Sequence, residues 1–180
     1  MESTTHVHHN SSCCSYNLGN TFRQSLSELD FERGIWYAAQ YNDLDRVRYL
    51  LNKGISPNVE DNAGYTALHY AVRNGHDEIC NELLKRGANV NAVTRSGRAT
   101  PLHRAATQKY IHIVELLLNA NADTNMQDVD GFTALHRALI ANCDQISRML
   151  IPKTRMDLID KFNYTVKDLS EKIGKQDLFF

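Results

Sequence analysis

Three histidines recur at nearly constant spacing along the chain. His69, His103 and His136 lie 34 and then 33 residues apart. An imidazole can act as a general base or ligate a metal ion, so the array raises both hypotheses. Consecutive copies of a packed helical unit stand roughly 10 Å apart, however, which is too far for a shared ion. The spacing therefore favours one structural histidine in each copy of a repeated unit.

A second group of metal-ligand types lies near the start of the chain. It comprises His6, His8, His9, Cys13 and Cys14. Imidazole and thiolate suit zinc, but the order His-x-His-His-x3-Cys-Cys has the spacing of no zinc motif that we can name. We interpret this segment as a polar tail, with a weak metal site as the alternative, and we expect no cofactor.

The remaining cysteines, Cys80 and Cys143, give no sign of catalysis. Cys80 takes the place of an apolar residue in a helical pattern and is expected to be buried, whereas Cys143 is expected to be partly exposed. Neither has a histidine or acid at a meaningful spacing. The chain also contains no Gly-rich phosphate loop and no His-Glu-x-x-His helix. We therefore predict a protein that is not an enzyme and has no catalytic residue.

Composition narrows the function classes further. The 180 residues include 20 Lys and Arg against 21 Asp and Glu, a net charge of −1 that gives no overall attraction for nucleic acid or anionic membranes. The polar N-terminus lacks the apolar core of a secretory signal, and no apolar run approaches the roughly 20 residues that span a bilayer. Four cysteines make no disulfide framework. We expect an intracellular protein, cytoplasmic or nuclear, without membrane contact.

The histidines belong to a repeated unit of about 33 residues. Its first half recurs at Asp61–Ala71, Gly97–Ala106 and Asp128–Ala138. Its second half recurs in register at Ile79–Leu84, Ile113–Leu118 and Ile146–Ile151. A weaker copy precedes these at residues 35–54, and a partial copy follows at residues 163–169.

This pattern resembles the ankyrin repeat, whose hallmark is Thr-Pro-Leu-His-x-Ala. Thr100 to Ala105 match it in full, and Ala replaces Pro in the other two copies. The resemblance covers about Asp30 to Phe180. It implies an all-α ankyrin-repeat solenoid with about four helix-turn-helix repeats, β-turn fingers between them and a C-terminal capping half-repeat. It also implies that the histidine bonds near the Thr at the helix start and holds the turn.

The expected boundaries follow from this alignment. The repeats fall at about residues 30–60, 61–93, 94–127 and 128–159, with a cap at 160–180. Together they make a domain of residues 24–180, and residues 1–23, rich in Ser, Asn and His, are expected to form a disordered tail.

Local residue choices support the helices. Thr66 is a good N-cap. Gly87, and Asn121 in the next repeat, follow a second helix where a positive φ is needed. Lys109 stands where another repeat has Gly, so mild strain is expected there. Gly64, Gly97 and Gly131 are expected at the tips of the turns.

The core and the ends of the stack give further expectations. Leu84 and Leu117 should be fully buried between repeats, so truncation of either to Ala should cost about 2–5 kcal/mol. Trp36 stands at the histidine position of an atypical first repeat. Pro152 should end the last full helix early. Leu169, Ile173 and Leu178 are expected to cover the C-terminal end.

By the same resemblance, the turn tips and first helices line a concave face that binds a partner. The predicted partner-binding residues are Tyr65, Arg73, Asn74, Arg95, Arg98, Arg104, Thr107, Gln108, Phe132, Arg137 and Ile140. The arginines predict an acidic or phosphorylated segment, with Tyr65 and Phe132 as apolar anchors. Asp77, Glu78, Glu82 and Glu115 should lie on the back.

We therefore predict a monomeric, non-enzymatic interaction module, an adaptor or scaffold, whose partner is another protein. One alternative is a nucleic-acid binder that uses the concave Arg and Tyr residues, and another is a metal-binding protein that uses the N-terminal Cys/His tail. Asn58, Asn91 and Asn125 end the repeats. In the family such asparagines can be hydroxylated, but we favour a role in stabilising the turn.

Overall fold

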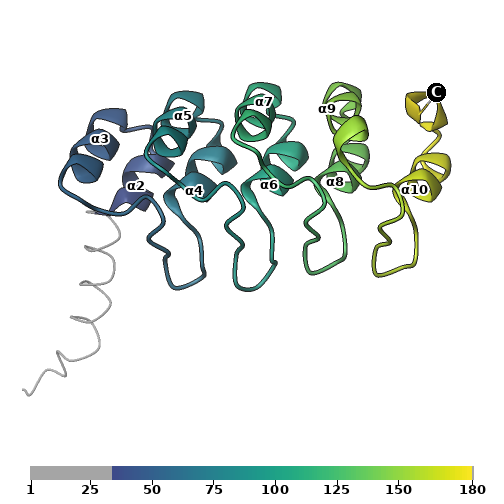
Figure 1. Cartoon of the computed structure of the whole chain (residues 1–180), viewed down its shortest axis with the longest axis horizontal. Coiled ribbons are helices and arrows are strands. Elements are labelled where there is room, and N and C mark those ends of the chain that lie inside the picture. Colours follow the sequence, from purple (N-terminus) through teal and green to yellow (C-terminus); the bar gives the residue numbers. More distant parts are fainter. Residues whose placement is uncertain (1–33, 180) are drawn as a thin grey trace, which may run out of the picture.

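The computed structural model describes residues 34–179, which form two rows of helices joined by long turns (Figure 1). The inner row comprises α2 (Ile35–Gln40), α4 (Ala67–Asn74), α6 (Pro101–Gln108), α8 (Ala134–Ile140) and α10 (Val166–Lys172). The outer row comprises α3 (Leu44–Asn52), α5 (Asp77–Lys85), α7 (Ile111–Asn119) and α9 (Asp144–Leu150), and short 3₁₀ helices follow α9 at Ile151–Lys153 and α10 at Gln176–Phe179. The predicted all-α repeat solenoid is confirmed.

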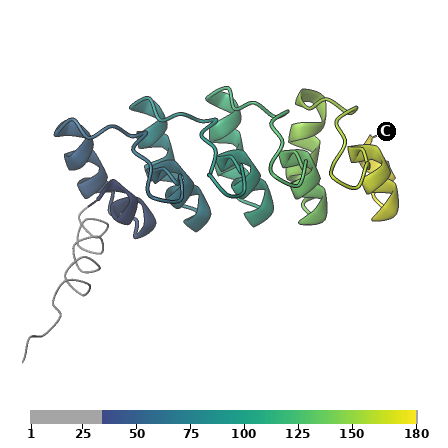
Figure 2. The same ribbon diagram turned by 90° about the horizontal axis from the view of Figure 1, so that it is seen from below.

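The pairs α2/α3, α4/α5, α6/α7 and α8/α9 stack side by side along one axis (Figure 2). Within residues 34–179 no strand forms beyond an isolated bridge between Ile159 and Thr165. In the same residues no helix is long and apolar enough to cross a membrane. The predicted tail at residues 1–23, with its Cys/His cluster, lies outside the described residues.

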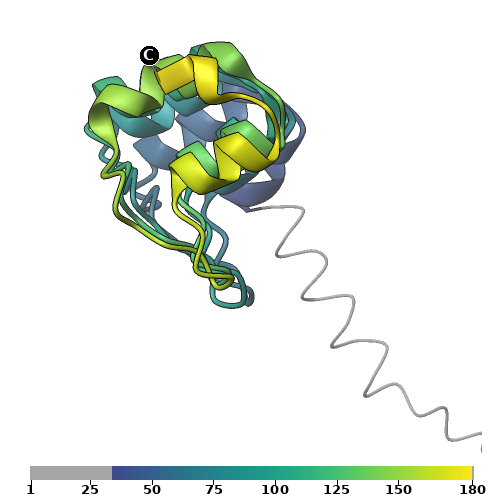
Figure 3. The same ribbon diagram turned by 90° about the vertical axis from the view of Figure 1, so that its right-hand side faces the viewer.

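The turns between successive pairs project to one side of the helices as a row of fingers (Figure 3). We define the fingers as residues 61–65, 94–99, 128–132 and 160–164. The Oδ1 atom of Asp61 accepts two N–H groups of its own finger at 2.8 Å each.

The other fingers are closed in related ways. Asp128 and Asp160 repeat the arrangement of Asp61, whereas Thr94 accepts a single N–H group through its hydroxyl at 3.2 Å. Neighbouring fingers are then joined through the backbone N–H groups of Arg95, Val129 and Lys161, at 3.1, 3.0 and 3.0 Å.

Buried histidines join the start of each inner helix to the next finger. His69 Nδ1 accepts the N–H of Thr66 at 3.2 Å, so its proton lies on Nε2, which donates to the carbonyl of Ala99 at 3.2 Å. His103 makes the same link to the carbonyl of Phe132, at 2.8 Å. The predicted role of this histidine in holding the turn is confirmed, and the link also reaches the neighbouring repeat.

The link changes at both ends of the stack. His136 Nδ1 accepts the N–H of Thr133 at 3.2 Å, but its Nε2 makes no hydrogen bond within the described residues. At the first repeat the indole N–H of Trp36 donates instead to the carbonyl of Val59, at 2.8 Å. The terminal repeats are therefore atypical, as predicted.

Helix-ending residues adopt the predicted left-handed conformation. Gly87 and Asn121 have φ of 82° and 61°, and Lys109 has φ of 63°. A left-handed residue other than glycine costs roughly 1 kcal/mol, so the strain expected at Lys109 is present. Pro152 lies in the 3₁₀ turn directly after α9, which ends at Leu150 as expected.

All three predicted glycines lie in the turns, but the left-handed residue of the third finger is a different one. Gly64 and Gly131 adopt positive φ of 79° and 75°, but in the third repeat Arg98 does so, with φ of 48°, and Gly97 does not. This finger has one residue more than its neighbours. The insertion moves the left-handed position one step along the chain.

The core prediction is half right. Leu117 is fully buried, whereas Leu84 is only partly buried and its neighbour Leu83 is fully buried. An outer helix meets the core on one side only, so the roughly 100° step from one residue to the next moves Leu84 to the edge. At the C-terminal end Leu169 and Leu178 pack against the core, but Ile173 is 39% exposed and does not cover it.

These burials make a quantitative prediction. Leu117→Ala should lower the free energy of unfolding by about 2–5 kcal/mol, because it leaves a cavity between repeats. Leu84→Ala should cost about half as much, because part of its side chain already meets water. Urea unfolding followed by circular dichroism measures both. A loss below about 1 kcal/mol for Leu117→Ala would contradict the assigned packing.

The histidine links predict a pH dependence of stability. Burial is the main cause that lowers the pKa of His69 to about 4, and it lowers the pKa of His103 and His136 in the same direction. An unfolded histidine titrates near 6.5, so between pH 6.5 and 4 the unfolded chain binds protons that the folded chain does not. The free energy of unfolding should therefore fall as the pH falls through this window, by about 3 kcal/mol for His69 alone.

Urea unfolding between pH 7 and 5 tests this dependence. His103→Gln removes one titrating link and should flatten the decline. His112→Gln, at an exposed position of α7 where the imidazole lies 3.6 Å from Glu115, is the matched control. Because an exposed pair contributes little to stability, this variant should change the decline much less than His103→Gln does. An equal decline in wild type and His103→Gln would show that the buried imidazoles are not its source.

Candidate interaction surface

The concave face is the corner between the fingers and the inner helices. We define it by the four fingers together with α4, α6, α8 and α10. Tyr65, Arg95, Arg98 and Phe132 come from fingers, and the other predicted residues come from inner helices. Those helical residues are Arg73, Asn74, Arg104, Thr107, Gln108, Arg137 and Ile140. The structure therefore brings all of the sequence-predicted binding residues to one side of the stack.

Two of the predicted arginines are already paired. The Nε atom of Arg137 donates to Asp128 at 2.8 Å, and its Nη2 contacts both Asp128 and Asp130. Arg95 lies 3.5 Å from a carboxylate oxygen of Glu60. Arg137 therefore ties α8 to its own finger, and its positive charge is offset within the protein.

The fourth finger carries the rest of this charge network. Lys161 Nζ donates to Asp130 at 2.5 Å, and this bond is the main cause that holds the pKa of the Asp130 carboxyl below its usual range. Arg137 contributes to the same shift. Asp130 is therefore a bridging anion between consecutive fingers.

The remaining arginines lie on the second and third repeats. Arg104 stacks on Tyr65, with its guanidinium carbon 5.2 Å from the ring centre, and donates to the Tyr65 hydroxyl at 2.5 Å. Arg73 and Arg98 are exposed and form no ion pair with any residue between 34 and 179. The predicted arginines that have no ion pair with a described residue, Arg73, Arg98 and Arg104, therefore lie on these two repeats.

Tyrosines line the second repeat beside this charge. Tyr70 donates its hydroxyl to Asp61 at 2.6 Å. Burial and this bond raise the pKa of Tyr70, so it stays protonated. The ring centres of Tyr65 and Tyr70 lie 5.7 Å apart, which gives the corner an aromatic wall that ends at Arg104.

A depression of about 340 Å³ lies between α6 and the 128–132 finger. It is lined by Arg104, Thr107 and Gln108 on one side and by Asp128, Val129 and Arg137 on the other. Asp130 also lines the depression. Asp128 and Asp130 both contact Arg137, and Lys161 pairs with Asp130, so Arg104 is the lining charge that has no ion pair among the described residues. The structure therefore presents the guanidinium of Arg104, a carboxylate-binding group, in a shallow recess whose lining surface is mainly apolar.

The sequence reasoning missed a second depression, of about 620 Å³, at the C-terminal end of the concave face. Its lining comprises Phe132, Asp160, Phe162, Tyr164, Leu169, Lys172 and Ile173. A signal was present in the sequence, because Phe162 stands at a finger tip where the aligned residues of other repeats are Ala63 and Asp130. Phe162 is 60% exposed.

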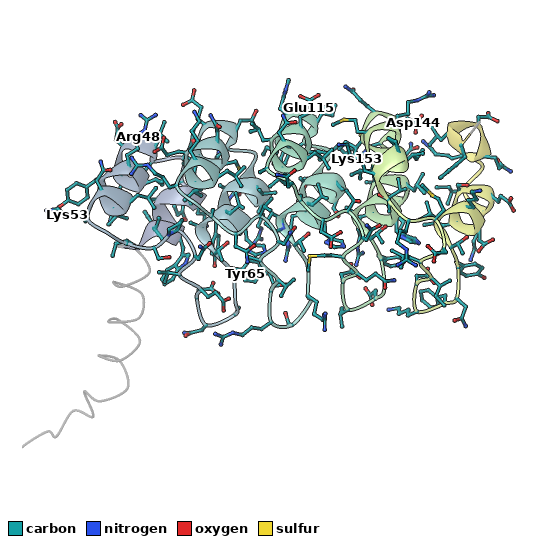
Figure 4. All side chains as sticks on the ribbon, viewed as in Figure 1. Arg48, Lys53, Tyr65, Glu115, Asp144 and Lys153 are labelled. Atoms are coloured by element: carbon teal, nitrogen blue, oxygen red, sulfur yellow. The ribbon has the colours of Figure 1, made fainter. Side chains whose placement is uncertain are left out.

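The outer row carries the acidic residues that the sequence assigned to the back. Asp77, Glu78 and Glu82 lie on α5 and Glu115 lies on α7, away from Tyr65 (Figure 4). The charge division is nevertheless incomplete. Arg48 and Arg86 lie on the same side, 3.5 and 3.1 Å from Glu82.

The asparagines at the repeat ends bridge successive repeats. Asn58 accepts the N–H of Asn89 at 2.6 Å, and Asn91 accepts that of Asp123 at 2.9 Å. Asn125 likewise accepts the N–H of Arg155 at 2.7 Å. These contacts support the predicted turn-stabilising role, and hydroxylation stays an alternative.

The thiols and imidazoles of residues 34–179 form no reactive centre. Cys80 is buried, and burial raises the pKa of its thiol, while Cys143 is partly exposed, both as predicted. In the described part of the chain no group of three or more His, Cys, Asp or Glu could hold a metal ion.

Comparison with known proteins gives the chain its relatives. The family described as ankyrin repeats (three copies) matches residues 7–94 and 93–161. Human ankyrin repeat domain-containing protein 39 is 53% identical over 85 residues, which are 46% of this chain and 45% of that protein. The Bos taurus protein of the same name is 57% identical over 65 residues, 36% of each.

A more distant relative is named as an enzyme. The palmitoyltransferase Hip14 of Drosophila melanogaster is 39% identical over 99 residues, which are 55% of this chain but only 16% of that protein. The matched stretches thus span less than half of each of these relatives. From the matched residues and the stacked helix pairs, the chain belongs to the ankyrin-repeat family, whose repeats generally mediate protein–protein interaction.

Proposed function

We propose that this chain is a non-enzymatic adaptor that binds an extended acidic or phosphorylated segment of another protein along its concave face. The observation that carries the proposal is the set of uncompensated arginines, Arg73, Arg98 and Arg104, on adjacent repeats. A guanidinium presents a planar fork of donors that matches carboxylate or phosphate.

Two arginines at equivalent positions of α6 and α8 have different roles in this proposal. Arg104 and Arg137 occupy the same place in consecutive repeats, directly after the histidine. Arg137 is bound by Asp128 and Asp130, whereas Arg104 rests on Tyr65 and keeps its charge. Held against an aromatic ring, Arg104 loses little side-chain freedom on binding, which favours affinity.

The fourth repeat supplies apolar contacts instead of charge. Val129 and Ile140 are 60% and 51% exposed on its finger and inner helix. Phe132 is partly buried beneath Arg137, whose guanidinium carbon lies 4.7 Å from the ring centre. The proposed partner segment therefore runs with acidic groups over the second and third repeats and apolar side chains over the fourth.

The nucleic-acid alternative has less support. Asp61, Asp128 and Asp130 lie on the same face as the arginines, and a nucleic-acid site requires many phosphate contacts with a steep salt dependence. The metal-binding alternative concerns the Cys/His tail, outside the described residues. We further propose that the chain acts as a monomer without a cofactor, in the cytoplasm or nucleus.

Charge reversal on the two faces tests the proposal. The double variant Arg73→Glu, Arg98→Glu should reduce capture of the partner by at least about tenfold, because it removes two anion contacts and adds repulsion. The matched control is Lys85→Glu, Arg148→Glu, which makes the same change of charge on exposed positions of the outer row. Quantitative affinity purification with mass spectrometry, with and without phosphatase treatment of the extract, provides the measurement.

The expected result is loss in the concave variant alone, with both variants folded by circular dichroism. Loss after phosphatase treatment would assign phosphate as the anion, and retention would assign carboxylate. Equal capture by wild type and the concave variant would overturn the proposal and place the binding surface elsewhere.

A further inference from the structure

The concave face ends in an apolar depression that the arginines do not account for. We call it the cap pocket and define it by Phe132, Phe162, Tyr164, Leu169, Lys172 and Ile173. It lies between the last two fingers and α10. At about 620 Å³ it falls in the range of pockets that hold small ligands or single side chains.

One register position adds an aliphatic side chain to the aromatic lining of the pocket. Leu169 stands in the cap where Arg104 and Arg137 stand in the third and fourth repeats. Arg104 lies over Tyr65, which is the last residue of the finger one repeat earlier. In the cap, Leu169 corresponds to Arg104 and Phe132 corresponds to Tyr65. An aliphatic side chain therefore lines the pocket together with Phe132, in place of a guanidinium.

The pocket is also open to solvent. Phe162, Tyr164 and Ile173 are exposed to 60%, 38% and 39%, although Lys161 lies over the ring of Phe162, 5.2 Å from its centre. In a solenoid a following repeat buries the equivalent surface of each unit. An aromatic and aliphatic patch of this kind at the end of a binding groove is typical of an interaction site.

The pocket lining holds one cation, Lys172, and one anion, Asp160. Lys172 lies 4.7 Å from the ring centre of Tyr164 and forms no ion pair with the described residues. The acid in the lining, Asp160, is turned into its own finger, where its Oδ1 accepts the N–H groups of Phe162 and Tyr164 at 2.8 and 3.0 Å. The pocket thus combines an apolar floor with one uncompensated ammonium group.

We infer that the cap pocket binds a bulky apolar side chain, aromatic or leucine-like, that has a carboxylate beside it. This inference rests on the proposed function, because the side chain would belong to the same partner segment. Arg104 lies two repeats from α10, roughly 20 Å along the stack. Since an extended chain advances about 3.3 Å per residue, about six residues separate the acid read by Arg104 from this anchor.

Two small probes test the pocket without the partner. The full chain, labelled with nitrogen-15, is titrated with N-acetylphenylalanine, which carries both a ring and a carboxylate, and with its neutral amide. The acid should shift the amide signals of Phe162, Tyr164, Leu169 and Ile173 in a saturable way. It should bind at least about threefold more tightly than the neutral amide, because only the acid can pair with Lys172.

Three variants assign the effect. Ile173→Asp should abolish the shifts, whereas Ile55→Asp, at an equally exposed isoleucine in the loop after α3, should leave them unchanged. Lys172→Gln should reduce binding of the acid to the level of the amide. Shifts that do not saturate, or that survive Ile173→Asp, would overturn the inference, as would equal binding of the two probes.

A second copy of the chain is the competing occupant. Concentration-dependent shifts of the same signals without a probe would show self-association there and would overturn the inference. The proposed function is judged separately. If Arg73→Glu, Arg98→Glu abolishes capture while the pocket ignores both probes, the concave face remains the binding surface and only the anchor is wrong.

Discussion

The structure depends on a buried imidazole that serves two repeats at once. His69 and His103 accept an N–H group from the threonine that begins their own helix and donate to a carbonyl of the next finger. Both ring nitrogens are used, and the ring must be neutral for the Nδ1 atom to accept. Burial maintains this state by lowering the pKa. The fingers at residues 94–99 and 128–132 are therefore each tied to the inner helix of the preceding repeat.

Some residues of the repeats are used in bonds within the protein, and others remain available to a partner. The capping threonines and the buried histidines are used in internal bonds, whereas some side chains of the finger tips and inner helices, such as Arg73 and Arg98, form no ion pair with a described residue. Arg104 and Arg137 show the consequence. They share a register position, but the acids of the adjacent finger neutralise Arg137, while Tyr65 supports Arg104 and leaves it charged. Identical residues on one scaffold can thus serve structure in one repeat and recognition in the next.

Much of the fold could be predicted from the sequence because its determinants are local and repeated. The period, the capping threonines and the left-handed position of Lys109 each depend on a few neighbouring residues. The errors arose where neighbours in space decide. Leu84 and Leu83 are both apolar, and only the side on which the inner row packs makes Leu83 the core residue. In the third finger, which has one residue more, the left-handed conformation falls on Arg98 and not on Gly97.

The sequence predicted where the candidate surface lies, but not which of its arginines form ion pairs. The repeat pattern brings the eleven proposed residues to one side, whereas the pairing of Arg137 depends on acids that only the folded finger brings into reach. The cap pocket was missed for a similar reason. Leu169, Ile173 and Leu178 were all predicted to cover the core, but Ile173 is exposed and lines the pocket together with Phe162, for which no role was predicted.

Hydrogen–deuterium exchange of the full chain, free and with its captured partner, tests the central claim most directly. If the concave face is the binding surface, the partner should slow exchange in the fingers at residues 61–65, 94–99 and 128–132 and at the ends of α4 and α6. Exchange in the outer helices α5, α7 and α9 should be unchanged. Protection confined to the outer helices, with the fingers unaffected, would contradict the account.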